Sequence, residues 1–232
     1  ISFQSRANGE LSSTLGNPIQ AACVSFGSGF LILLVVSLLS APMRTALTRI
    51  PAAGRAGHLP RWHVVGGTLG ATFVIVQAHA VPLIGVALFS VATIGGQTVA
   101  SMVVDRLGLR AGITHKVTAR RMLTGSLTVL AVLVSVSDRI SVAGTSWVAP
   151  LLGLLVGAGV SVQRALNAHV NDYVEHSFAT TWWNFMTGCA LLFTVLALTT
   201  IGGGDVVALP MHTWWMYAGG AIGVVYIAMA NV

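Results

Sequence analysis

The chain has 232 residues, of which 55% are apolar and only 8% charged, and its mean hydropathy is +0.83. Ordinary soluble domains carry about 25% charged residues, so this composition excludes a water-soluble single domain. The net charge of +6 does not indicate nucleic-acid binding, because the basic residues gather in two short loops and not on a basic face with polar surroundings.

The apolar runs predict membrane-spanning helices, since a span needs about 20 apolar residues. In chain order they lie near residues 1-11, 17-39, 62-81, 84-104, 121-137, 147-169, 178-201 and 213-232. The predicted fold class is an all-α membrane protein, a polytopic helical bundle. We expect about eight of ten helices to be present, with the first and last cut by the ends of the chain.

Prolines predict where helices are interrupted, because proline cannot donate a backbone hydrogen bond. Pro82 predicts a tight turn between the third and fourth helices. Pro42, Pro51 and Pro60 predict an irregular loop over residues 41-61.

Cys23 and Cys189 both lie inside apolar runs, where cysteine is typical of a small core residue. The sequence has no Cys-x-x-Cys motif and no cluster of cysteine and histidine. We therefore expect no metal and no cofactor.

The sequence contains a weak internal repeat. One constant offset places Ser2, Gln4 and Asn8 on Ser161, Gln163 and Asn167, then Phe26 on Phe185 and Gly29 on Gly188. The pattern Trp62-x3-Gly66-Gly67-x2-Gly70 recurs as Trp215-x3-Gly219-Gly220-x2-Gly223. We predict two repeats, residues 1-140 and residues 141-232.

The second repeat begins after five predicted helices, an odd number, so it enters the membrane from the opposite side. The positions of the basic residues agree with this inversion. Nine of the 12 Lys and Arg residues lie in the loops after the second and fourth helices, which the positive-inside rule assigns to the cytoplasm. The loop over residues 202-212, which corresponds to the first of these, has none. Inverted repeats are a known transporter architecture with a substrate site near the membrane midplane.

The segment Gly95-Gly96-Gln97-Thr98-Val99-Ala100-Ser101 followed by Asp105-Arg106-Leu107-Gly108-Leu109 resembles a signature of the YdcZ-like, EamA-related family of the drug/metabolite transporter superfamily. Gln4-x3-Asn8 and Gln163-x3-Asn167 are similar to the Gln-Ala-x-x-Asn segment of that family. Arg106 and Leu107 replace the usual His-Phe. The resemblance implies an integral, multi-pass protein of a prokaryotic plasma (inner) membrane, built as two fused five-helix repeats.

Polar side chains inside a membrane indicate functional positions because they are costly in hydrocarbon. The predicted substrate-binding residues are Gln4, Asn8, Gln97, Ser101, Gln163, Asn167, Trp183 and Asn184. The alternative for the amides is a role in holding helices together, where such bonds are worth about 0.6 kcal/mol. For Trp183 the alternative is an aromatic belt at the membrane interface.

The sequence favours a secondary carrier of a small polar or cationic metabolite or drug over an enzyme. An intramembrane enzyme would need a Ser/His pair, two embedded Asp residues or a metal cluster, and the sequence shows none of these. The alternative is a non-transporting scaffold or lipid-handling protein. All six acidic residues fall at predicted helix ends or in loops, so coupling to a proton or another cation stays open. The sequence also leaves open whether the protein forms a homodimer.

Overall fold

The computed structural model describes residues 2–109, 118–143, 147–210 and 213–231. In these ranges the chain forms α-helices and two short 3-10 helices, without a β-strand. The helices are α1 (Ser2–Leu15), α2 (Pro18–Leu39), α3 (Ala41–Arg55), η1 (Arg61–Val65), α4 (Gly66–Leu107), α5 (Ala119–Ala143), α6 (Val148–Val174), α7 (Ser177–Ile201), η2 (Trp214–Tyr217) and α8 (Ala218–Ala230). The predicted all-α membrane bundle is confirmed.

Four segments in the described ranges are long and apolar enough to cross a membrane: α2, the segment Trp62–Leu107, α6 and α7. Large apolar side chains stand exposed on these helices, including Leu39 on α2 and Ile201 on α7. A soluble protein would bury such residues, whereas a bundle in lipid presents them to the hydrocarbon.

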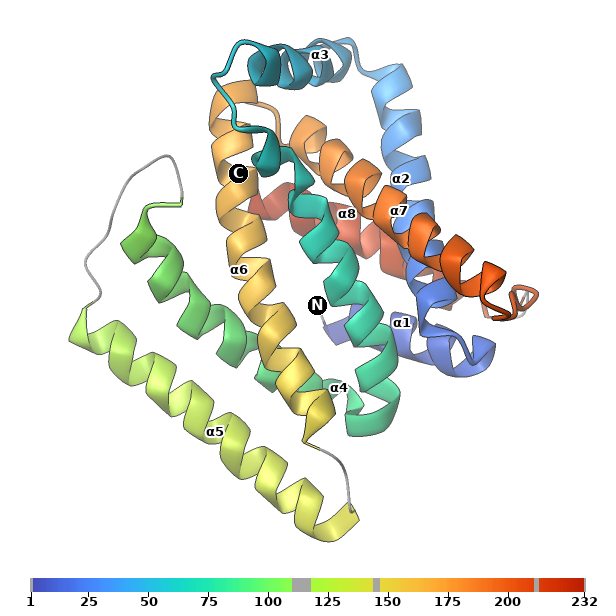
Figure 1. Cartoon of the computed structure of the whole chain (residues 1–232), viewed down its shortest axis with the longest axis vertical. Coiled ribbons are helices and arrows are strands. Elements are labelled where there is room, and N and C mark those ends of the chain that lie inside the picture. Colours follow the sequence, from blue (N-terminus) through green and yellow to red (C-terminus); the bar gives the residue numbers. More distant parts are fainter. Residues whose placement is uncertain (1, 110–117, 144–146, 211–212, 232) are drawn as a thin grey trace.

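Helix α4 is bent back on itself and forms two arms, which we define as residues 66–84 and 86–107 (Figure 1). The bend lies at Gly85, whose φ of 80° and ψ of 159° belong to a region that is essentially open to glycine alone. The predicted turn between the third and fourth helices is present, but it lies at Gly85 and not at Pro82, which lies within the helix. A proline removes one hydrogen bond, but the reversal itself needs the glycine conformation.

Helix α3 corrects the predicted loop over residues 41-61. It lies across one end of the bundle (Figure 1) and packs against α6 and α7. Its buried side chains, Met43, Ala46, Ile50 and Ala53, share one helical face. Pro42 is tolerated because it occupies the first turn, where the Ser40 hydroxyl caps the N–H of Met43.

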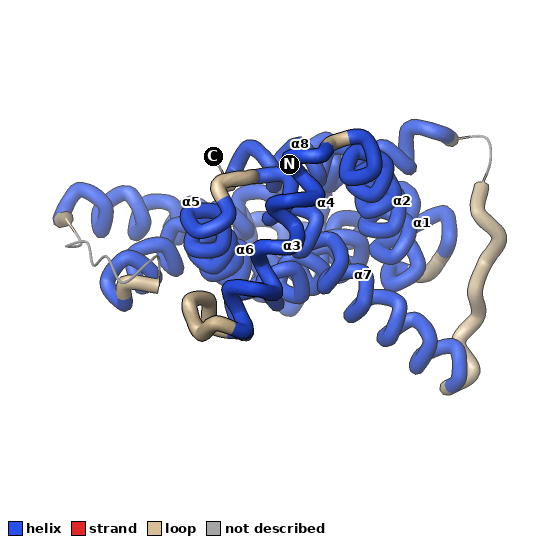
Figure 2. Tube along the Cα trace, turned by 90° about the horizontal axis from the view of Figure 1, so that it is seen from above, coloured by secondary structure: helices blue, strands red, loops and turns tan. Residues whose placement is uncertain are grey.

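The second arm of α4 and helix α6 pack so closely that their backbones touch. A Cβ added at Gly96 would lie 1.9 Å from the carbonyl oxygen of Leu154, and one at Gly157 would lie 2.2 Å from that of Thr93. Figure 2 shows α5 on one side of the bundle and the loop after α7 at the opposite edge. The elements between them surround a small internal space.

Candidate functional site

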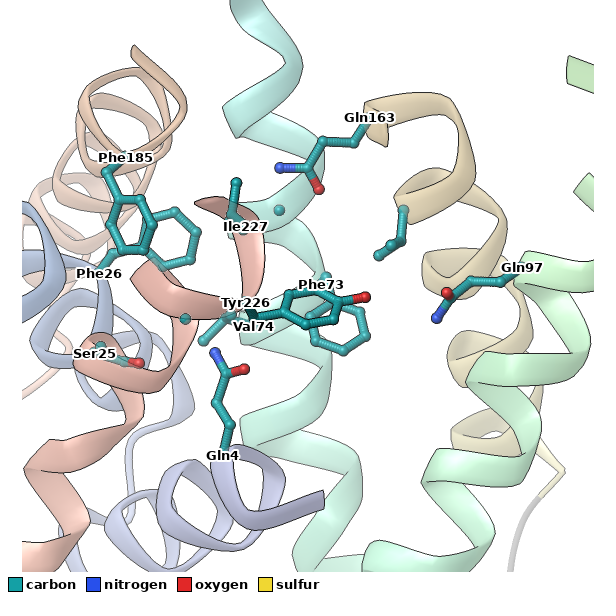
Figure 3. A pocket seen from close by; sticks show the side chains of 14 residues that line it. Gln4, Ser25, Phe26, Phe73, Val74, Gln97, Gln163, Phe185, Tyr226 and Ile227 are labelled. Atoms are coloured by element: carbon teal, nitrogen blue, oxygen red, sulfur yellow. The ribbon is translucent and has the colours of Figure 1, made fainter. Parts of the chain in front are cut away.

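A central cavity lies between both arms of α4 and the helices α1, α2, α6, α7 and α8. Its lining includes three of the predicted residues, Gln4, Gln97 and Gln163, and aromatic rings that include Tyr226 (Figure 3). The empty space, counted with its mouth, is about 520 Å³, but only a small part of it has clearance for water. In this conformation the cavity is almost closed.

Two of the three glutamines present amide groups without a protein partner. Gln4 on α1 is 7% exposed, and Gln97 lies half-buried on the second arm of α4. Among the residues that the structure describes, neither side-chain amide makes a hydrogen bond. Buried amides are usually paired, because an unpaired one costs about 1–3 kcal/mol. The cavity thus offers two free donor–acceptor groups to a bound solute.

Gln163 is held by a chain of buried amides. Its Nε2 donates to Oδ1 of Asn184 at 3.0 Å, and Nδ2 of Asn184 donates to Oδ1 of Asn167 at 2.7 Å. Asn184 also donates to the carbonyl oxygen of Thr180 at 3.2 Å. Asn167 and Asn184 do not line the cavity; they orient the Gln163 side chain that does.

Asn8 joins a second buried network outside the cavity. Its Nδ2 donates to Oε1 of Gln77 at 2.6 Å, and Nε2 of Gln77 donates to Oγ of Ser5 at 2.8 Å. This network ties α1 to the first arm of α4. The position of Asn8 fits the helix-holding alternative.

Trp183 and Ser101 lie in other surroundings. Trp183 is half-buried against the apolar core, with its ring centroid 5.8 Å from that of Trp182, and it is not among the cavity-lining residues. Ser101 lies in a wider, open hollow next to the cavity, together with Asp105 and Arg164. We call this hollow of about 980 Å³ the vestibule, and Gln97 lines both it and the cavity.

Residues that the repeat equates make equivalent contacts. A Cβ at Gly70 would meet the amide of Gln163 at 2.6 Å, and one at Gly223 would meet that of Gln4 at 3.1 Å. Gly66 faces Asn167 as Gly219 faces Asn8. In each pair, a glycine of one predicted repeat gives room to an amide of the other.

The aromatic contacts are reciprocal in the same way: a ring of each predicted repeat lies over a glycine of the other. The ring of Phe26 lies over Gly188, and the ring of Phe185 lies over Gly29. The two rings meet each other with centroids 4.9 Å apart at the cavity wall. The second helix of each predicted repeat, α2 or α7, therefore packs against the second helix of the other.

Three features were missed from sequence. Arg164 bonds Tyr226, Gln77 links Asn8 to Ser5, and Nδ1 of His169 lies 3.1 Å from Nε2 of His63. Arg164 and Gln77 carried a signal, since each is a polar residue within an apolar run. Tyr226 carried none, because a tyrosine in an apolar helix is ordinary.

Four arginines of the predicted basic loops lie on helices. Arg44, Arg49 and Arg55 belong to α3 and Arg106 to the end of the second arm of α4, whereas Arg110 and Lys116 lie outside the described residues. No group of three or more His, Cys, Asp or Glu residues that would hold a metal ion occurs in the described part of the chain. The chemistry of the cavity is that of amides and aromatic rings.

A bundle of apolar helices around a narrow, mainly apolar cavity with a few polar groups defines a polytopic membrane protein of the transporter class. The family model "Putative inner membrane exporter, YdcZ" matches residues 1–134 and 148–232, so the chain belongs to the YdcZ family of the drug/metabolite transporters. This confirms the resemblance drawn from Gln97 and its neighbours and makes the chain a multi-pass inner-membrane protein. A search of curated proteins and a search of solved structures found no match.

Proposed function

We propose that the chain is a secondary carrier that moves a small polar or cationic metabolite or drug through the central cavity. The observation that carries this proposal is the pair of free amides, Gln4 and Gln97, inside a cavity lined by both predicted repeats. No carboxylate lines the cavity in the described part of the chain. A cationic group would therefore rest on ring faces, where each contact is worth about 0.5–2 kcal/mol.

The mechanism that we propose is alternating access between inverted repeats, residues 1-140 and 141-232. The reciprocal contacts of Gly70 with Gln163 and of Gly223 with Gln4 support it, because the same kind of contact occurs at two equivalent places between the predicted repeats. Rocking of one repeat against the other at these contacts would open the narrow cavity to each side of the membrane in turn. Membership of an exporter family supports the direction out of the cell.

The proposal is tested by transport in proteoliposomes. Gln4→Leu and Gln97→Leu keep the side-chain size but remove the free amides, so we expect each to reduce solute uptake at least about tenfold, the effect of losing roughly 1.4 kcal/mol of binding. The assay uses a broad panel of metabolites and drugs, with and without a proton gradient.

Thr194→Val serves as the matched control, since Thr194 is an exposed residue of α7 whose hydroxyl bonds only the Ala190 carbonyl in the same helix. It should leave uptake unchanged. A wild-type protein that moves no solute of the panel, or Leu variants that transport as well as wild type, would contradict the proposal and favour a non-transporting scaffold.

A further inference from the structure

Arg164 is an exposed cation on the membrane-spanning helix α6, and its hydrogen-bond partner is a neutral phenol. It lies ten residues before the end of α6 at Val174, which is roughly 15 Å along the helix axis. Its Nη2 donates to the hydroxyl of Tyr226 on α8, and its guanidinium carbon lies 5.4 Å from the centroid of that ring. A charged residue at such a depth is normally paired or functional.

No carboxylate forms an ion pair with Arg164 among the residues that the structure describes. A guanidinium has five N–H donors, and the Tyr226 hydroxyl occupies one of them. Arg164 lines the vestibule together with Gln97, Ser101, Ser161 and Asp105. Arg164 thus presents a positive charge in a polar hollow without an ion-paired carboxylate.

The contact between Arg164 and Tyr226 stands at the boundary between two spaces. Tyr226 lines the central cavity, Arg164 lines the vestibule, and Gln97 lines both. Figure 3 shows the Tyr226 ring above Gln4 with its hydroxyl pointing toward the side where Gln97 lies. A solute passing from the vestibule to the cavity would meet this ring.

We propose that Arg164 binds an anionic group of the transported solute, a carboxylate or a phosphate, and that this binding releases Tyr226 and opens the way from the vestibule to the cavity. This inference rests on the proposed carrier function and narrows its substrate to solutes that carry such a group. The planar guanidinium fits carboxylate and phosphate oxygens with two parallel bonds, which a phenol cannot offer.

The charge preference of the vestibule can be measured without knowing the solute. Cys23 and Cys189 are first replaced by alanine, and Ser101→Cys places a single thiol in the vestibule. Its labelling rate is compared for three methanethiosulfonates, the anionic sulfonatoethyl, the cationic trimethylammonioethyl and a neutral methyl reagent. Arg164→Gln should lower the anionic-to-cationic rate ratio by about fivefold or more, because a charge this close attracts one reagent and repels the other.

Matched variants make the result specific. Arg6→Gln removes an arginine that contacts Trp215 and lines a different hollow, so it should leave the ratio unchanged. Asp105→Asn should raise the ratio. An unchanged neutral-reagent rate shows that each variant is folded, and a ratio that Arg164→Gln does not move would overturn the anion site whether or not the protein transports.

A test of the gating step needs a thiol on the cavity side of Tyr226. Ser25→Cys supplies one in the cavity wall with little change in size. Tyr226→Phe loses the bond to Arg164, so we expect Cys at position 25 to react severalfold faster with the neutral reagent. An unchanged rate would contradict a gate at this ring.

A lipid headgroup also carries a phosphate, and the same labelling separates it from a solute. The ratio at position 101 is measured in nanodiscs of phosphatidylcholine alone and with added phosphatidylglycerol. A solute site predicts equal ratios in both. Loss of the anionic preference only with phosphatidylglycerol would mark Arg164 as a lipid site and overturn the assignment to a solute.

Discussion

Where two helices cross, glycines let the backbones approach each other closely, and this close packing positions the amides of the cavity. A Cβ at Gly67 would lie 1.9 Å from the carbonyl oxygen of Asn184 and 2.3 Å from the hydroxyl of Thr187. The equivalent position Gly220 would place its Cβ 2.2 Å from the carbonyl oxygen of Ser25. Membrane helices use such small residues because packing, not hydrophobicity, drives their association.

Gly67→Ala should therefore destabilise the protein by about 1–3 kcal/mol, the usual result of overpacking a rigid contact. We expect a midpoint of thermal unfolding in detergent several degrees below that of wild type. Gly159→Ala is the control, since its Cβ would meet nothing closer than Leu69 Cδ2 at 3.8 Å. Equal midpoints for the two variants would contradict the close contact.

Polar residues inside apolar runs were predictable from sequence, and Gln4, Gln97 and Gln163 do line the cavity. Their division into free and paired amides was not predictable. It depends on which helices meet, as the bonds from Asn184 to Asn167 and from Asn8 to Gln77 show. Sequence spacing gives the face of one helix, but not the side chain opposite it.

At the scale of elements, α3 shows how loop signals conceal a helix. Its buried residues Met43, Ala46, Ile50 and Ala53 are spaced as one helical face, a pattern visible in the sequence. Three prolines nearby suggested a loop instead. Capping by Ser40 and the contacts with α6 and α7 stabilise the helix despite Pro51 inside it.

Ile50→Asp should release α3 from the end of the bundle. Ile50 is 1% exposed, and burying a carboxylate there without a partner is unfavourable. We expect trypsin to cleave after Arg49 and Arg55 severalfold faster in inside-out vesicles. Thr48→Asp, at an exposed position of the same helix, should be cleaved at the wild-type rate. A wild-type rate for Ile50→Asp as well would mean that α3 is already detached from the bundle, which would contradict the packing.

At the scale of the whole molecule, the proposal of two equivalent halves is supported by reciprocal contacts. The pairs Gly66 with Asn167 and Gly219 with Asn8 join positions that the sequence repeat relates. The two matched segments of the family, residues 1–134 and 148–232, fall within the two predicted repeats. Arg164 and Tyr226 meet within the second predicted repeat, and Arg164 and Asp105 bring one positive and one negative charge to the vestibule.

The most direct test of inverted halves is the sidedness of two equivalent connections. Thr48→Cys on α3 and Val206→Cys after α7 both offer exposed positions, Val206 being 56% exposed. In a background without Cys23 and Cys189, a membrane-impermeant maleimide is applied to intact cells. Inverted halves predict labelling at position 206 at once and at position 48 only after permeabilisation; labelling of both from the same face would contradict the account.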